Sequence, residues 1–183
     1  TLINENYIAA VEVHKELLIE KYSQEFQYDV IHKEIQEING VMVLSFDHQL
    51  ALSIISHQIN DFGYEYKTIT LRNAYDVFLL SKKTNANAAV HTLDKLTNPL
   101  NCFLAACYEV FDRVDSLEYN KTKKTALYLR DFNSHFSTPI RAKTQSRFIK
   151  NYLFIKSRLN IIYKAIMYKE YRVWLFKRVT DKN

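Results

Sequence analysis

Glycine and proline are scarce in this chain, and their scarcity restricts the folds open to it. The 183 residues contain two of each. Tight turns draw on glycine for positive φ and on proline for a fixed φ, and a sheet-rich protein needs many such turns. At 48% hydrophobic residues, the chain can still bury a sizeable core. We therefore predict a mainly α fold, a multi-helix array with one or two short strands near the N-terminus.

The hydropathy pattern places the strands early and the helices after them. Apolar residues indicate a strand over 7–14, follow roughly helical spacing over 15–38, and form a second strand, 41–44, after Asn39-Gly40. We expect Ser45 to cap the next helix. The further predictions are a helix to 59, a helix over 71–83 with Thr70 as a second N-cap candidate, and helices over 86–96, from Asn98-Pro99 to 114 and over 120–133. Ser137-Thr138-Pro139 is expected to be a break, and a helix that bends once follows from 143 nearly to the end.

Charge divides the chain unevenly. Residues 1–140 hold 13 Lys and Arg against 18 Asp and Glu, a net charge of −5. Residues 141–183 hold 12 against 2, a net charge of +10. Such a concentration of positive charge at one end is typical of a segment that meets a polyanion or an acidic surface.

Two cysteines and the lack of a long apolar run bear on the compartment. Cys102 and Cys107 lie five residues apart in an apolar stretch, a poor spacing on a helix for a disulfide or a metal site. We expect two buried free thiols, which suits a reducing cytoplasm. No apolar run approaches the roughly 18 residues that cross a bilayer, and no signal peptide is evident. The prediction is a cytoplasmic protein without a transmembrane segment.

Two sets of polar side chains are candidates for chemistry. Glu12 and His14 share one face of the first predicted strand, because side chains alternate along a strand. An acid beside an imidazole is typical of an active site, but an edge-strand pair facing water has the same pattern. The second set joins His57 to Arg72 and Asp76, which are four residues apart and share a helix face. The simpler interpretation there is a surface ion pair.

Several segments of this chain occur in an order found in a known family. They are Val11-Glu12-Val13-His14, Leu44-Ser45, His57-Gln58-Ile59-Asn60 and Leu71-Arg72-Asn73-Ala74-Tyr75-Asp76-Val77-Phe78-Leu79-Leu80. The chain resembles the C-terminal part of a bacterial nucleotidyltransferase family with the polymerase-beta-like fold. In that family an α/β catalytic core ends in an apolar–acid–apolar–His strand, and a helical region follows. The resemblance covers residues 7–83, and residues 84–183 match only as a helical tail.

The resemblance implies roles for individual residues. Glu12 falls where the fold places its third carboxylate, which would help two upstream acids hold Mg²⁺ ions for a nucleoside triphosphate. His14, His57, Arg72 and Asp76 would then contact the nucleotide substrate. Mg²⁺ is the cofactor that this interpretation requires.

The chain also departs from the family pattern. Neither the Gly-Ser turn nor the Asp-x-Asp pair of the catalytic core is present in the sequence. Residues 1–44 are therefore expected to be the end of a catalytic-type α/β core, or an N-terminal extension, and residues 45–183 a helical domain with a basic C-terminal helix. Transfer of a nucleotide from a nucleoside triphosphate to an acceptor would need catalytic residues upstream.

A second resemblance lies further along the chain. Arg130 and His135, in Leu129-Arg130-Asp131-Phe132-Asn133-Ser134-His135, resemble the active motif of HEPN domains, which are helical bundles and often metal-independent RNases or toxins. In that chemistry the His is a general acid or base, and the Arg stabilises the pentacovalent phosphate. Such sites usually form across a homodimer. The alternative is a helix C-terminus whose His interacts with the last carbonyls.

The basic C-terminal segment interleaves cations with aromatic residues. Its basic surface is predicted to include Arg147, Lys150, Lys156, Arg158 and Arg172. Such a helix can follow a phosphate backbone and stack bases, so a nucleotide or a nucleic acid is a candidate partner. It can also lie on an anionic membrane, present a solvated basic face or dock onto the acidic body of the chain. A non-enzymatic helical interaction module is the remaining functional alternative.

Overall fold

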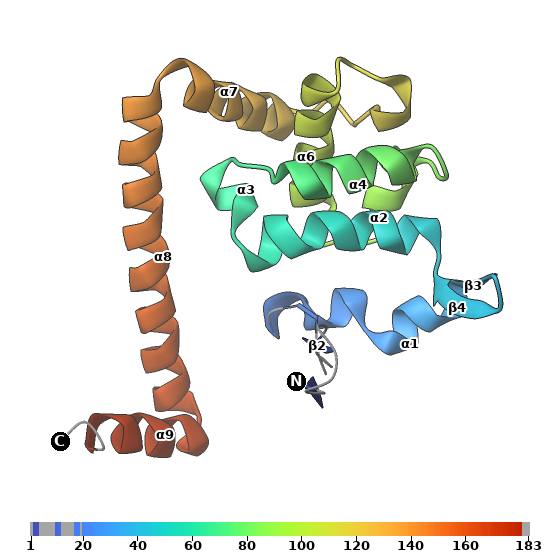
Figure 1. The fold of residues 1–183 in the computed structure, drawn as a ribbon. Coiled ribbons are helices and arrows are strands. Elements are labelled where there is room, and N and C mark those ends of the chain that lie inside the picture. Colours follow the sequence, from blue (N-terminus) through green and yellow to red (C-terminus); the bar gives the residue numbers. More distant parts are fainter. Residues whose placement is uncertain (1, 4–9, 12–16, 19, 181–183) are drawn as a thin grey trace. The chain divides into compact units, whose positions relative to one another are not determined.

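The computed structural model describes residues 2–3, 10–11, 17–18 and 20–180, and it is mainly α as predicted (Figure 1). The chain forms two compact units, which we call unit 1, up to Asn133, and unit 2, from Ser134. The sequence placed a boundary at residue 44 instead. Residue 44 ends a strand that contacts the following helix, so the two sides of that position belong to one unit.

The N-terminal part of unit 1 holds the strands. β1, Leu2–Ile3, pairs antiparallel with β2, Ala10–Val11, which lies inside the strand predicted over 7–14. The 3-10 segment η1, Glu20–Phe26, follows, and then α1, Tyr28–Ile31, and the 3-10 segment η2, His32–Glu34.

The second strand pair is a hairpin. β3, Ile35–Ile38, pairs antiparallel with β4, Val41–Leu44. Asn39 and Gly40 join them with φ of 53° and 79°, as in a two-residue hairpin turn. The prediction of helical structure over 15–38 was therefore wrong for residues 35–38. The turn places Ile38 opposite Val41, and residues 35–38 then pair with residues 41–44 as a strand.

Helices make up the rest of unit 1. α2, Phe46–Ile55, begins behind Ser45 and continues into the π-helix η3, Ser56–Asn60. The remaining elements are α3, Gly63–Tyr66; α4, Leu71–Ser81; α5, Ala86–His91; α6, Thr97–Val110; the 3-10 turn η4, Asp115–Leu117; and α7, Lys123–Ser137, whose last residues belong to unit 2. α6 begins two residues before Pro99, which falls in the first turn, where its missing N–H is not needed.

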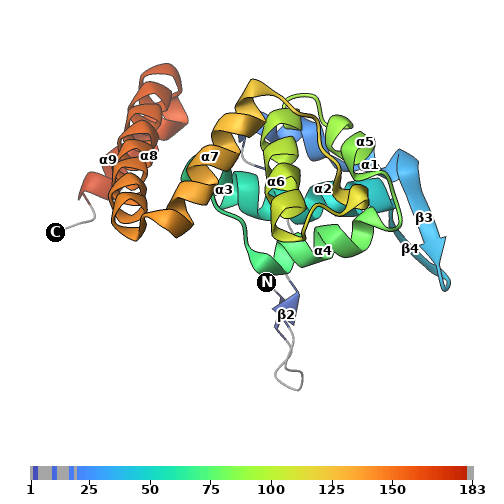
Figure 2. The same ribbon diagram turned by 90° about the horizontal axis from the view of Figure 1, so that it is seen from above.

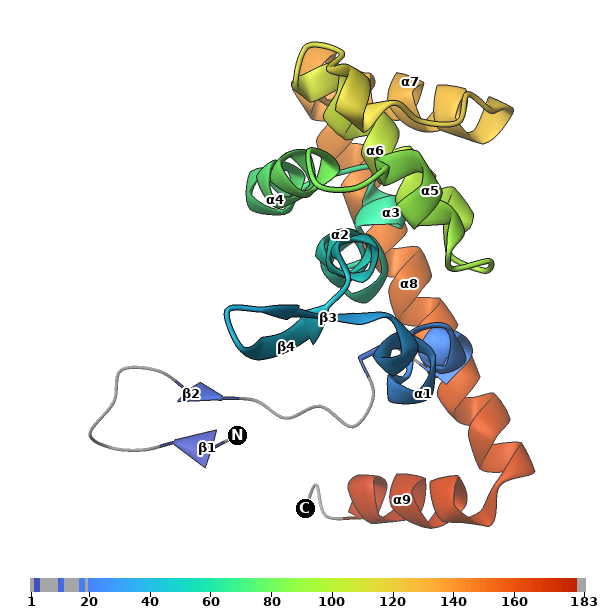
Figure 3. The same ribbon diagram turned by 90° about the vertical axis from the view of Figure 1, so that its right-hand side faces the viewer.

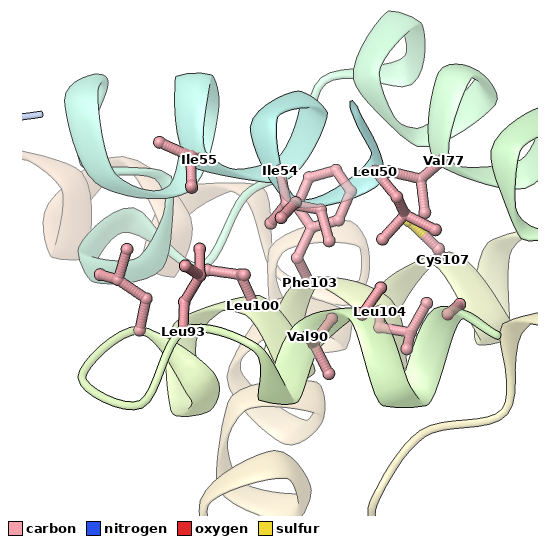
Figure 4. Close-up of a cluster of buried hydrophobic side chains, with 14 of the residues drawn as sticks. Leu50, Ile54, Ile55, Val77, Val90, Leu93, Leu100, Phe103, Leu104 and Cys107 are labelled. Carbon is pink, nitrogen blue, oxygen red and sulfur yellow. The ribbon is translucent and has the colours of Figure 1, made fainter. Parts of the chain in front are cut away.

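The core of unit 1 is built around α6. Every residue from Pro99 to Cys107 is buried, because α2, α4 and α5 contact this helix (Figure 2) and Tyr128 and Phe132 of α7 pack against its Cys102. Leu50, Ile54 and Phe103 meet in the main cluster (Figure 4). α2 lies between this helical layer and the β3–β4 hairpin (Figure 3). One buried polar side chain, Asn101, is satisfied by two hydrogen bonds with the backbone of Asn120.

Unit 2 consists of the end of α7 and two long helices. α8, Pro139–Met167, starts with a proline in its first turn, as expected from the Ser137-Thr138-Pro139 break. α9, Lys169–Thr180, follows after the extended residue Tyr168, which is the predicted bend. Of the helices within the described part of the chain, none combines the length and apolar character that a bilayer span requires.

Candidate functional site

The first predicted pair, Glu12 and His14, lies outside the described residues. Their roles in holding Mg²⁺ and substrate stay predictions. Within the described ranges, no three His, Cys, Asp or Glu side chains gather closely enough to hold a metal ion. These residues alone therefore do not form a site for the metal that the nucleotidyltransferase resemblance implies.

His57 lies on the π-helix η3, and the loop that follows wraps around its ring. Its Nε2 is 3.3 Å from the Thr68 hydroxyl, and its Nδ1 is 3.7 Å from the Asp61 carboxylate. Gly63 lies against the same ring, and a Cβ on Gly63 would come within 2.6 Å of it. The imidazole thus holds the loop over 61–68 in place, a structural role. Contact between His57 and a nucleotide stays a prediction.

A second set of contacts anchors the same loop. Gln58 Nε2 and the Tyr128 hydroxyl both donate hydrogen bonds to the Thr68 carbonyl, at 2.9 and 3.2 Å. The Lys67 ammonium lies 4.3 Å from the centre of the Tyr64 ring and 5.3 Å from that of Tyr128. Burial lowers the pKa of Lys67. These contacts fasten α7 to the loop before α4, and they leave the buried Gln58 Oε1 without a hydrogen-bond partner within the described chain.

Arg72 and Asp76 lie on α4 with both side chains exposed. No ion pair between them is found among the described side chains, so the predicted surface pair does not form here. Asp76 lines a shallow groove with Gln49 and Leu79. Contact of Arg72 and Asp76 with a nucleotide stays a prediction.

Arg130 and His135, the predicted RNase pair, both lie on α7. The Arg130 guanidinium donates from Nε and Nη2 to the Asp131 carboxylate, at 3.1 and 3.0 Å. His135 is half-buried, and its Nε2 has no hydrogen-bond partner within the described chain. Arg130 belongs to unit 1 and His135 to unit 2. Their joint action on RNA stays a prediction.

Unit 2 carries the basic surface. The predicted cations Arg147, Lys150, Lys156, Arg158 and Arg172 are all exposed. Several cations lie over aromatic rings, with Lys156 5.9 Å from Tyr152 and Arg158 4.9 Å from Phe154. Arg172 also donates from Nη1 to the Ile166 carbonyl, at 3.1 Å, and so satisfies a backbone acceptor in the last turn of α8.

Trp174 on α9 is the most defined feature of this surface. Its side chain is 43% exposed and lines two shallow apolar hollows, one with Ile161 and Tyr171 and the other with Lys169 and Lys177. The Arg178 guanidinium lies 5.2 Å from the centre of the indole ring. An accessible aromatic surface is thus flanked by three cations. The sequence shows Trp174 only as one of many aromatic residues in this segment.

Negative charge is sparse around this aromatic surface. Glu170 lines both hollows, and unit 2 contains one further acid, Asp181, in its sequence. The site is therefore suited to an anionic ligand with flat, stackable groups. Comparison of the chain with protein-family models, curated proteins and solved structures gave no match.

Proposed function

We propose that the chain binds single-stranded nucleic acid through unit 2. Trp174 would stack on a base, and Lys169, Lys177 and Arg178 would contact phosphates. The observation that carries the proposal is a half-exposed indole flanked by three cations in a unit with net charge +10. Stacking on an aromatic side chain is tolerant of sequence and is worth about 1–3 kcal/mol per base, while each phosphate contact releases a counterion.

The distribution of cations on α9 favours nucleic acid over a membrane surface. A helix that lies on a membrane needs one face that is continuously apolar. At about 100° per residue, Lys169, Arg172, Lys177 and Arg178 point to widely separated directions around the axis. α9 therefore has cations on all sides, which suits a flexible polyanion that can follow the helix surface.

The test uses the full chain and an RNA of about 20 uridines, longer than a typical single binding site. Because Trp174 is the single tryptophan of the chain, bound RNA is expected to quench the intrinsic fluorescence. The change Trp174→Ala should weaken binding about 5- to 100-fold, measured by anisotropy of labelled RNA. Tyr75→Ala, which removes an exposed aromatic side chain from unit 1, is the matched control and should leave binding unchanged.

A charge series separates phosphate contact from stacking. Replacing Lys169, Lys177 and Arg178 with Gln should make the slope of log K against log salt concentration shallower by roughly 2, because each phosphate contact with a single strand contributes about 0.7 to that slope. The control replaces the exposed Lys83, Lys121 and Lys123 of unit 1 with Gln. It removes the same charge, and the slope of log K against log salt concentration should not change. Binding that is insensitive to salt, or tighter binding to anionic vesicles than to RNA, would overturn the proposal.

Two catalytic activities stay proposals beside this one. The RNA of the binding assay tests the first: metal-independent cleavage that is lost in His135→Ala would support the RNase interpretation, and intact RNA at high protein concentration would exclude it. Nucleotidyl transfer is tested with labelled nucleoside triphosphate and Mg²⁺ in a protein that includes upstream sequence. Full activity of the Glu12→Ala variant there would refute the metal role of Glu12.

A further inference from the structure

α8 carries an apolar stripe that nothing in unit 2 covers. Its members alternate at spacings of four and three residues, and we call them the α8 seam: Phe148, Tyr152, Ile155, Leu159, Ile162 and Ile166. Their side chains are 52–73% exposed. Alternation of four and three is the a/d pattern of a two-helix seam, which keeps one stripe facing a partner helix.

The seam is large for an exposed surface. At roughly 100 Å² of exposed area per side chain, the six members leave about 600 Å² uncovered. This is at the upper end of the largest apolar patch on a typical monomer, and patches of that size often have a function. If the same stripe on a second chain covered it, about 1,200 Å² would be buried in total, which is the lower end of stable protein–protein interfaces.

We propose that the α8 seam joins two copies of this chain as a parallel, in-register coiled coil. A seam of heptad period fits best against a helix of the same period, and a second copy supplies such a helix with identical spacing. The proposal does not depend on nucleic-acid binding, because the cations flanking Trp174 lie on α9.

Residues beside the seam select the parallel arrangement. In a parallel pair, Arg158 would lie opposite Tyr163 of the second copy, and Asn151 opposite Lys156 of the second copy. Neither contact joins like charges, and the first can place a guanidinium over a ring. In an antiparallel pair, Lys156 would face its own counterpart, and so would Arg158. Two like-charge contacts beside a short seam would disfavour that arrangement.

The charge of unit 2 gives the dimer a distinctive response to salt. Two units of net charge +10 repel each other, and added salt screens that repulsion. We therefore expect the dimer to tighten as salt rises, whereas binding to nucleic acid should weaken. Because salt should affect dimerisation and nucleic-acid binding in opposite directions, failure of one proposal can be distinguished from failure of the other.

Sedimentation of the full chain over a range of concentrations tests the association. The expected species at high concentration has twice the 21.7 kDa mass of one chain. Ile155→Asp with Leu159→Asp should raise the dissociation constant at least about 100-fold, because two charges would enter the seam. Phe154→Asp with Ser157→Asp adds the same charge to exposed positions outside the seam, and this control should remain a dimer.

Cross-linking tests the register. In the parallel dimer the two Phe148 positions meet, so Phe148→Cys should form an intermolecular disulfide under mild oxidation. In an antiparallel dimer Phe148 would meet Ile166 instead, and no such bond would form. A monomer at all concentrations, an unaffected Ile155→Asp/Leu159→Asp variant, or a dimer without the Phe148→Cys cross-link would overturn the proposal. Circular dichroism checks that each variant retains its helices.

Discussion

Cys102 and Cys107 show how one helix can serve two clusters. Both are buried free thiols, as predicted. Cys102 packs with Tyr128 and Phe132, whereas Cys107 belongs to the main cluster around Phe103. Residues five apart on a helix point to different sides, so α6 joins the two clusters.

Burial of these thiols predicts a loss of stability at alkaline pH. Desolvation raises the pKa of Cys102 from 9.0 to about 11, despite the nearby Lys67 and Lys124, and it also raises the pKa of Cys107. Between pH 9 and pH 11, the unfolded chain releases a proton from Cys102 that the folded chain keeps. The free energy of unfolding therefore falls as pH rises through this window, and the Cys102 contribution is constant below it.

Cys102→Ala removes one of these titrations. We expect the slope of unfolding free energy against pH to become shallower between pH 9 and pH 11 by up to about 1.4 kcal/mol per pH unit. Urea denaturation at neutral pH and at steps through this window measures it. Tyr128, whose pKa burial also raises, remains in both proteins, so its titration contributes to the slope of each. An identical slope in the variant and the parent would contradict the prediction.

At the scale of elements, the two predicted N-caps behave differently. The Ser45 hydroxyl accepts a hydrogen bond from the His48 backbone N–H at 3.3 Å, so the start of α2 is satisfied by a side chain. Thr70 occupies the corresponding position before α4, but its side chain makes no cap hydrogen bond. Its hydroxyl is buried and has no hydrogen-bond partner within the described chain.

This difference predicts unequal effects of removing the two hydroxyls. Ser45→Ala should lower the free energy of unfolding by about 1 kcal/mol, the usual cost of losing a cap. Thr70→Val keeps the shape of the side chain and removes a polar atom without a partner, so it should be neutral or slightly stabilising. Urea denaturation of both variants measures the effects. A loss at Thr70 as large as that at Ser45 would refute this account.

The sequence predicted the ends of helices and strands best where interactions within a few residues determine them. The Asn39-Gly40 turn, the Ser45 cap and the break before Pro139 each act within a few residues, and each is confirmed. Residues 35–38 could not be assigned in this way. Their apolar spacing suits a helix or a strand, and only pairing with residues 41–44 selects the strand.

At the scale of the whole molecule, the two units differ in how they are stabilised. Unit 1 has a core around a fully buried helix segment. In unit 2, Ala165 is the only buried side chain among those that the structure describes. Unit 2 therefore gains little from hydrophobic burial and depends on local helix stability, which is marginal for isolated helices.

Limited proteolysis should reflect this difference. Unit 2 holds 12 Lys and Arg in lightly packed helices, so trypsin is expected to cleave it first and to leave a resistant fragment that ends near α7. Mass spectrometry of the early products identifies the sites. The exposed Lys82 and Lys83, at the end of α4, are the internal comparison in unit 1. Cleavage there as fast as in unit 2 would contradict the expectation.

Parts of the candidate sites were visible in the sequence and parts were not. The basic, aromatic segment is a property of composition, so it could be predicted directly. Lys177 and Arg178 follow Trp174 by three and four residues on α9, so their proximity is set by the helix period, whereas the exposure of Trp174 depends on packing. The enclosure of His57 by Gly63 and Thr68 likewise needs the loop over 61–68 to fold back.

The sequence by itself determined the helical class, the short early strands and the division of charge. Scarce glycine and proline limit tight turns, and net charge follows from composition. Tertiary structure alone decided that His57 holds a loop, that Arg72 and Asp76 stay apart, and that Trp174 is accessible beside cations. Those outcomes depend on how the loop over 61–68 folds back, on side-chain conformation and on which surfaces are packed, and sequence spacing does not determine these.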